Sequence, residues 1–89
     1  MDKHLNIRVW GMVQGVFFRQ TTRERARKLK LTGFARNEPD GAVYIEVEGR
    51  EENLQTFLKF CKRGPFLARV KSIETTEGSL KNFFDFHIS

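Results

Sequence analysis

Alternating apolar and polar residues predict a strand near the start of the chain. Between His4 and Trp10, the side chains of Leu5, Ile7 and Val9 fall on one face of an extended backbone and the polar ones fall on the other. This is the pattern of a strand with one buried face. Gly11 then ends it.

A second pair of extended segments is expected at 33–37 and 42–48, joined by the tetrapeptide EPDG at 38–41. In such a turn Pro presets φ and Gly takes the left-handed position, so the two segments form a hairpin. The strand at 42–48 is expected to have one dry and one wet face. Its apolar face holds Val43, Ile45 and Val47, and its exposed face holds Tyr44, Glu46 and Glu48.

Two stretches have helical periodicity. Residues 20–30 contain no Gly or Pro and place Thr22, Ala26 and Leu29 along one side, as in a surface helix. Residues 51–62 are amphipathic and stop at Gly64. Their apolar stripe consists of Leu54, Phe57, Leu58 and Cys61.

The last third of the chain predicts two more strands. Residues 67–77 form a strand of less regular pattern, and 76–82 make a loop. Phe84, Phe86 and Ile88 alternate in a short final strand, with both phenylalanines in the core.

The resulting order, β-α-β-β-α-β with a short extra C-terminal strand, predicts an α+β fold: a ferredoxin-like sandwich with two helices on one face of an antiparallel sheet. Its 89 residues fit a single domain, 1–89. A right-handed crossover makes the first two strands parallel, with the third strand between them. The loop after Trp10 and the residue Asn37 should then face each other at one sheet edge.

Composition narrows the partners and the compartment. Lys and Arg number 16 against 11 Asp and Glu, a net charge of +5 that favours anions without choosing among nucleic acid, acidic lipid and phosphorylated metabolites. The single Cys61 fits a reducing compartment, and the absence of a long apolar run predicts a cytoplasmic protein without a membrane partner. Cys61 is expected in the core, and His4 and His87 at the surface or an edge.

The basic first helix is interpreted as a solvated face that draws anions toward the site, not as a nucleic-acid surface. Its cations are Arg23, Arg25, Arg27, Lys28 and Lys30.

The stretch GMVQGVFFRQ, 11–20, is a candidate anion site. It leads into a helix N-terminus, where unpaired N–H groups and the helix dipole favour phosphate. Gly15 permits a backbone nest, and the guanidinium of Arg19 suits two phosphate oxygens. Taken alone, a loop of this kind is more often a simple turn, and an Asn at position 37 is more often a turn residue that bonds the backbone. Their expected convergence favours a site.

These residues carry a family resemblance over nearly the whole chain. GMVQGVFFR (11–19) resembles the G-x-V-Q-G-V-x-F-R signature of the acylphosphatase family, and GFARNEPDGAVYIEVEG (33–49) resembles its second signature. GPFLARV (64–70) is similar to the stretch that follows the second helix in that family. Phe34 and Ala35 replace the usual Trp and Val, at positions expected to serve packing.

The resemblance implies the same ferredoxin-like sandwich and hydrolysis of the carboxyl-phosphate bond of acyl phosphates, without metal or cofactor. Arg19 and Asn37 match the catalytic residues of the family. The phosphate-binding loop is implied to use backbone N–H groups of Gly15, Val16, Phe17, Phe18 and Arg19. The partners expected are an acyl phosphate and inorganic phosphate, with no nucleic acid, and the chain is expected to be a monomer.

Two alternatives remain open at this point. An RNA-binding module on the same sandwich would carry a basic, aromatic third strand, whereas 42–48 reads AVYIEVE. A non-catalytic anion-binding module would keep the loop without turnover. The sequence names neither the physiological acyl phosphate nor a role for Gln14.

Overall fold

The computed structural model describes residues 1–89, and its elements follow the predicted order. Each end lies within about two residues of the position expected from the hydrophobic pattern. The strands are β1 (Asp2–Met12), β2 (Thr32–Asn37), β3 (Val43–Arg50), β4 (Arg69–Gly78) and β5 (Phe86–Ile88), and the helices are α1 (Phe18–Lys28) and α2 (Glu51–Arg63).

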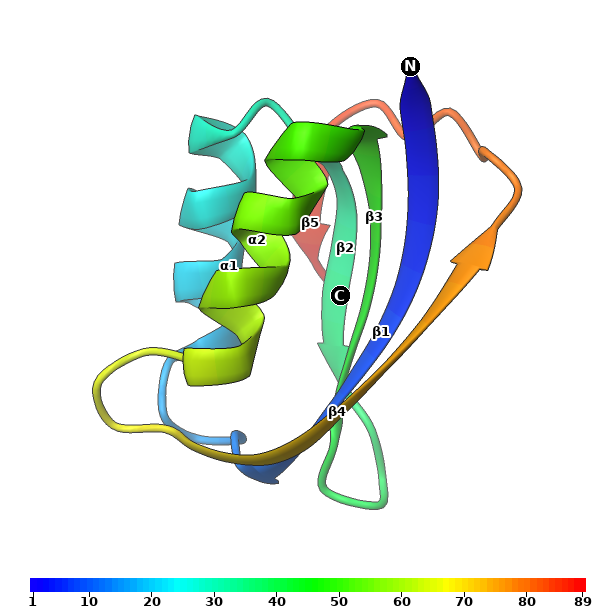
Figure 1. Cartoon of the computed structure of the whole chain (residues 1–89). Helices are drawn as coiled ribbons and strands as arrows, with labels where there is room; N and C mark the ends of the chain where they lie inside the picture. Colours follow the sequence, from blue (N-terminus) through cyan, green and yellow to red (C-terminus); the bar gives the residue numbers. More distant parts are fainter.

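The strands form one sheet in the order β4-β1-β3-β2-β5, with both helices on the same face (Figure 1). As predicted, β3 lies between β1 and β2 and is antiparallel to both. β5 pairs with β2 in parallel, so the sheet is mixed and not purely antiparallel. The C-terminal ends of β1 and β2 therefore lie at one end of the molecule, as Figure 1 shows. The fold is the expected ferredoxin-like α+β sandwich.

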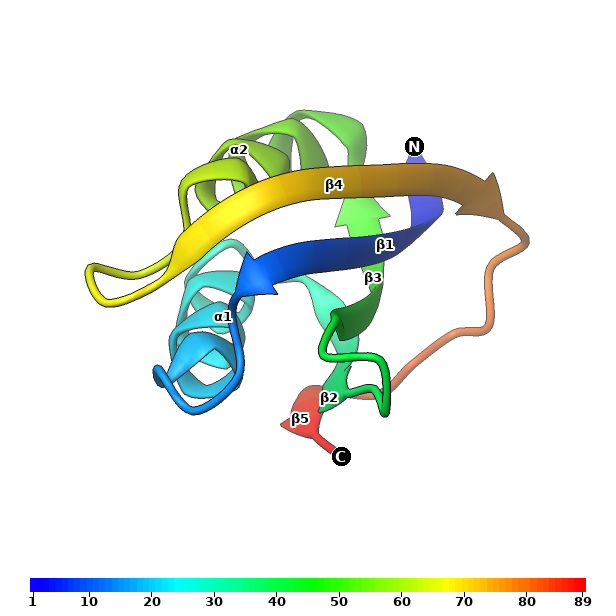
Figure 2. The same ribbon diagram turned by 90° about the horizontal axis from the view of Figure 1, so that it is seen from below.

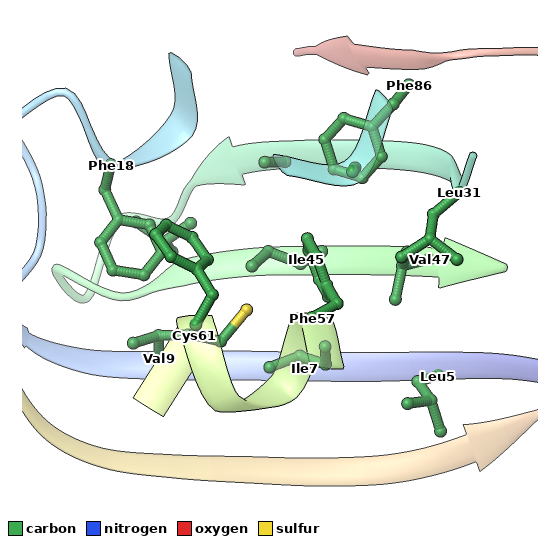
Figure 3. Packing of buried hydrophobic residues seen from close by; sticks show 14 of the residues in the cluster. Leu5, Ile7, Val9, Phe18, Leu31, Ile45, Val47, Phe57, Cys61 and Phe86 are labelled. Atoms are coloured by element: carbon green, nitrogen blue, oxygen red, sulfur yellow. The ribbon is translucent and has the colours of Figure 1, made fainter. Parts of the chain in front are cut away.

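The core fills the space between the sheet and the helices (Figure 3). It is a cluster of 17 buried residues, in which the rings of Phe57 and Phe86 lie 6.3 Å apart. Cys61 is fully buried in this cluster, as predicted, and burial raises the pKa of its thiol. The thiol is therefore a packing group that stays protonated at neutral pH.

The core prediction for Phe84 is wrong. β5 begins only at Phe86, which is buried, whereas the Phe84 side chain is fully exposed. Phe84 and Phe86 belong to one alternating pattern of apolar residues in the sequence. Phe84, however, lies in the connection before β5, so its side chain does not share the buried face of the strand. Alternation alone cannot distinguish the two cases.

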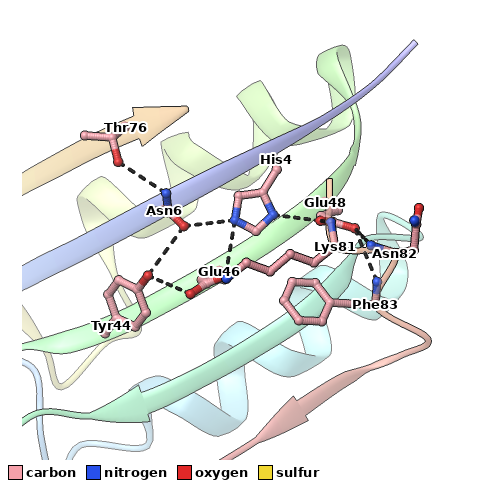
Figure 4. Close-up of polar contacts among 9 residues, drawn as sticks. All are labelled: His4, Asn6, Tyr44, Glu46, Glu48, Thr76, Lys81, Asn82 and Phe83. Atoms are coloured by element: carbon pink, nitrogen blue, oxygen red, sulfur yellow. Dashed lines mark hydrogen bonds and ion pairs between the residues drawn. The ribbon is translucent and has the colours of Figure 1, made fainter. Parts of the chain in front are cut away.

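The outer face of the sheet also differs from the prediction. His4, Glu46 and Glu48 were expected to be exposed or at an edge, but all three are buried. The connection between β4 and β5, residues 79–85, lies against this face (Figure 4). The ring of Phe83 stacks on that of His4 at 5.9 Å. The glutamates that argued against an RNA-binding strand are therefore covered by chain and do not face solvent.

A polar network fixes this connection to the sheet (Figure 4). Glu48 accepts hydrogen bonds from the backbone N–H groups of Lys81 at 2.5 Å and Asn82 at 3.0 Å. Burial raises the pKa of Glu48, but the N–H groups of Lys81 and Phe83, together with His4, outweigh burial and hold the pKa below its usual value. The carboxylate is thus ionised and acts as an acceptor for otherwise unpaired backbone amides.

The second glutamate of the network balances the charge of a lysine. Lys81 Nζ lies 2.7 Å from Glu46 Oε1, and the Tyr44 hydroxyl donates to Glu46 Oε2 at 2.7 Å. Burial and this hydrogen bond raise the pKa of Tyr44 to about 12. Both ring nitrogens of His4 face oxygens, at 2.7 Å from Glu48 Oε2 and 3.2 Å from Glu46 Oε1. Both nitrogens of the His4 ring therefore have a polar partner inside the network.

Candidate active site

The loop between β1 and α1 ends in an unusual helix start. Phe17 precedes the helix with φ 62°, in the left-handed region, and offers no side-chain cap. Gly15 is also left-handed, with φ 74°. Val13 and Phe18 anchor the loop because both side chains are buried in the core, and Val16 packs against that core. The loop backbone is thereby turned outward between two buried anchors.

This conformation leaves a row of backbone donors free. The amides from Gly15 to Gln20 donate to no protein carbonyl, and the first bond of the helix region runs from Thr21 N to Phe17 O at 3.1 Å. Free amides of this kind, at the positive end of a helix dipole and next to residues in the left-handed conformation, form a concavity that suits an anion. We call the free amides of residues 15–20 the cradle, and the loop between β1 and α1 the cradle loop.

A cavity of about 140 Å³ opens in front of these amides. Asn37, at the end of β2, lines the same cavity as Arg19, so the convergence expected from topology is observed. The remaining lining residues are Val13, Gly15, Phe17, Phe18 and Gln20. The volume is below the roughly 300–1,000 Å³ of pockets that enclose drug-sized ligands. It suits a phosphoryl group better than a whole organic substrate.

Arg19 supplies the only cationic side chain of the cavity wall. It lies in the first turn of α1 and is half-buried, and its Nη1 donates to the Ser89 carbonyl at 3.4 Å. No Asp or Glu carboxylate lies within 4.0 Å of this guanidinium, in contrast to Arg8, which pairs with Glu38 at 3.0 Å. Its charge is therefore available to an anion in the cavity.

Asn37 is exposed, and its side-chain amide makes no hydrogen bond with the protein. The amide has both a donor and an acceptor to offer. It lies where β2 enters the turn at 38–41, opposite the amides of the cradle.

Gln14, for which the sequence suggested no task, connects the two sides of the site. Its Nε2 donates to the backbone carbonyls of Glu38 at 2.8 Å and Ala42 at 2.9 Å. Both carbonyls belong to the hairpin connection that follows Asn37. The partners lie 24 and 28 residues away in sequence, so no local pattern could have revealed this link.

The cavity contains none of the side chains that serve as acid-base pairs or thiol nucleophiles. Its lining has no His, Cys, Asp or Glu, and nowhere in the chain do three such residues gather in a way that could hold a metal ion. What the site offers is oriented N–H groups, one guanidinium and one carboxamide.

Neither helix has the length and apolar character needed to cross a membrane.

Comparison with known proteins shows the family to which the chain belongs. The family model described as Acylphosphatase matches residues 5–88. The protein named "Acylphosphatase" from Archaeoglobus fulgidus is 44% identical over 85 residues, which cover 96% of each chain. The crystal structure of acylphosphatase from Bacillus subtilis superposes with a TM-score of 0.95 at 40% identity, covering 100% of this chain and 99% of that one. An acylphosphatase structure from Coxiella burnetii has a TM-score of 0.95 at 30% identity, covering 99% and 93%. The chain therefore belongs to the acylphosphatase family of hydrolases.

Proposed function

We propose that this protein hydrolyses the carboxyl-phosphate bond of acyl phosphates to a carboxylate and inorganic phosphate, using the cavity at the start of α1. The observation that carries the proposal is the convergence of free backbone amides, Arg19 and Asn37 on one small cavity. Membership of the acylphosphatase family supports the reaction, and the cavity supports the assignment of roles below.

The phosphoryl group would bind in the cradle. The amides from Gly15 to Arg19 donate to its outer oxygens, and the guanidinium of Arg19 donates to two of them. These donors are held in place before the substrate arrives, because Val13 and Phe18 fix the loop in the core. Preorganised donors stabilise the charge that develops on the outer oxygens in the transition state.

The leaving group makes an acid catalyst unnecessary. The bond that breaks joins phosphorus to a carboxylate oxygen, and the carboxylate departs with the bonding electron pair as a weakly basic anion. The site therefore needs positioning and charge stabilisation, which together dominate catalysis of phosphoryl transfer. The lining of the cavity matches this requirement.

Asn37 would orient the attacking water. Its carboxamide oxygen can accept a hydrogen bond from a water placed in line with the leaving oxygen. The water oxygen forms the new bond to phosphorus, and one water proton passes to a phosphoryl oxygen. The products are then a carboxylate and dihydrogen phosphate, so atoms and charge balance without a protein base.

We extend the proposal to the remaining properties of the chain. Residues 1–89 act as one domain and as a monomer in the cytoplasm, with no cofactor and no metal in the reaction. The acyl half of the substrate is left outside a cavity of about 140 Å³. Carbamoyl phosphate, aspartyl phosphates and 1,3-bisphosphoglycerate all present the same phosphoryl end to it.

Phosphate release from benzoyl phosphate in the presence of EDTA tests this function. The wild-type protein should release phosphate with EDTA present, and Arg19→Ala should lose both turnover and affinity for inorganic phosphate. Arg23→Ala is the matched control, since Arg23 lies one turn further along α1, outside the cavity, and pairs with no carboxylate. Phosphate binding without turnover would identify a non-catalytic anion-binding module instead, and a requirement for added metal would contradict the proposed mechanism.

A further inference from the structure

The connection between α2 and β4, residues 64–68, forms a protruding tip with apolar side chains. It stands out from the body of the sandwich in both views, drawn in yellow (Figures 1 and 2). The side chain of Phe66 is 96% exposed and that of Leu67 is 58% exposed. Phe66 thus remains almost entirely in contact with water, and Leu67 remains more than half exposed beside it, so the two form an exposed apolar patch at the tip.

Cations flank the tip on both sides along the chain. Lys62 and Arg63 precede it at the end of α2, and Arg69 and Lys71 follow it at the start of β4; all four are exposed. None of them lies within 4.0 Å of a carboxylate, whereas Arg27 pairs with Asp85 at 3.0 Å. The positive charge around the tip is therefore uncompensated.

A hollow of about 590 Å³ lies beside the tip, between it and α1. Arg25 from α1 joins Arg63 and Arg69 in its wall, and the ring of Phe66 lines it too. The Arg25 guanidinium lies 5.0 Å from the centre of the Phe60 ring, which holds it at the wall. Three unpaired guanidinium groups around a hollow of this size suit an anionic head group.

We propose that this tip docks the protein on membranes that contain anionic phospholipid. Phe66 and Leu67 enter the boundary between head groups and acyl chains, while Arg25, Arg63 and Arg69 contact lipid phosphates. A bilayer matches both the apolar tip and the arginines around it. The binding free energies from apolar insertion and from electrostatic attraction to anionic lipid add to each other. A nucleic acid would use the cations but would leave the Leu67 side chain in water, since its bases require flat stacking partners.

The docked orientation brings the active site near the bilayer. The cradle loop and the tip lie at the same end of the molecule in Figures 1 and 2. Met12, which is 66% exposed, pairs in register with Arg69 and extends the apolar surface from the tip toward the cradle loop. Docking requires no spanning segment, so the proposal differs from the expectation of no membrane partner, which rested on the lack of such a segment.

Vesicle co-sedimentation tests the apolar half of the proposal. The wild-type protein should sediment with phosphatidylcholine vesicles containing phosphatidylglycerol, and should not sediment with phosphatidylcholine alone. Phe66→Ser should weaken the partition coefficient about tenfold, the loss expected for one inserted aromatic side chain. Phe84→Ser is the matched control, because Phe84 is equally exposed but lies in the β4–β5 connection, and it should retain wild-type binding.

Charge reversal tests the electrostatic half. Arg63→Glu changes the charge by two units and should weaken binding by about 25-fold, since each unit of charge near an anionic surface changes binding about fivefold. Lys30→Glu changes the net charge equally but lies just beyond the C-terminal end of α1, away from the tip, and should change binding by less than about threefold. Benzoyl phosphate hydrolysis should be unchanged in Phe66→Ser, which reports that this variant is folded.

Several results would overturn the proposal. One is equal binding to neutral and anionic vesicles, and another is an equal loss in Phe66→Ser and Phe84→Ser. Binding of a single-stranded oligonucleotide without binding of anionic vesicles would assign the cations to nucleic acid. A dimer that Phe66→Ser dissociates, with no vesicle binding, would assign the tip to a second copy of the chain.

Discussion

The side-chain amide of Gln14 donates a hydrogen bond of 2.8 Å to the backbone carbonyl of Glu38, the residue directly after Asn37. A second bond from the same nitrogen reaches the Ala42 carbonyl at 2.9 Å. The loop that carries the free amides is thus tied to the turn that carries the carboxamide. The relative placement of the two halves of the site depends on a residue that does not line the cavity.

Replacing Gln14 should therefore affect geometry more than binding chemistry. Gln14→Ala removes two hydrogen bonds, which at about 0.5–1.5 kcal/mol each should cost about 1–3 kcal/mol of unfolding free energy. The two carbonyls stay paired, because they also accept from the backbone N–H groups of Gly41 and Glu38. Because small misplacements of reacting groups are costly, kcat for benzoyl phosphate should fall about tenfold or more, with a smaller change in phosphate affinity. Gln55→Ala, at an exposed position of α2, is the control and should match the wild type in both measurements. A wild-type kcat in Gln14→Ala would show that the link does not matter for turnover.

Gly15 offers a test of the backbone cradle without removing any side chain. Its φ is 74°, and a Cβ placed there would meet no atom within 4 Å, so Gly15→Ala introduces backbone strain and no clash. The cost should be about 1–2 kcal/mol, and relief of that strain should rotate the adjacent amides. We expect weaker binding of inorganic phosphate, measured by calorimetry.

Gly41 provides the matched control for that variant. It also has a left-handed φ, 94°, and open space around its Cβ position, but it belongs to the hairpin turn outside the cradle. Gly41→Ala should cost similar stability while phosphate affinity stays within about twofold of wild type. Equal losses of phosphate affinity in both variants would contradict a specific role for the Gly15 backbone.

The network under residues 79–85 should make stability depend on acid pH. Hydrogen bonds hold the pKa values of Glu46 and Glu48 below their usual value of 4.5 in the folded protein. Their stabilisation is therefore complete above about pH 4.5 and is lost as the pH falls through the folded pKa values. Glu48→Gln should lower the unfolding free energy at pH 7 by about 2–4 kcal/mol and flatten its decline in acid.

Urea unfolding between pH 3 and pH 7 measures both effects. Glu74→Gln, an exposed position on β4 without an ion pair, should reproduce the wild-type curve. An unchanged acid slope in Glu48→Gln would show that another carboxylate governs the transition.

Hydrophobic periodicity was sufficient to predict the order of the helices and strands, because the face that each element turns toward the core is mainly apolar. The stripe of α2 and the alternation of β1 follow directly from residues that pack in the core, such as Phe57 and Ile7. Periodicity could not predict that the outer face of β3 is buried. Glu46 and Glu48 are polar and still buried, because a segment more than 30 residues later in the chain covers them. Periodicity treats every polar position as solvent-facing, so it has no signal for such a face.

The site was predictable to the extent that topology and motif determine it. The strand order brings Asn37 to the loop that carries Arg19, and the motif resemblance gave both residues a role. The link through Gln14 and the start of α1 at Phe18, two residues before its expected start, depend on the three-dimensional course of the loop. The left-handed Phe17 in particular follows no propensity rule, since bulky residues seldom adopt that conformation.

In the proposed mechanism, Arg19 and the backbone amides bind phosphate while Asn37 orients the attacking water. The most direct test measures inorganic phosphate affinity and benzoyl phosphate turnover in the same preparation of Asn37→Ala. We expect phosphate affinity within about threefold of wild type and a kcat lower by about 100-fold or more. An Asn37→Ala protein that turns over benzoyl phosphate at the wild-type rate would contradict this mechanism.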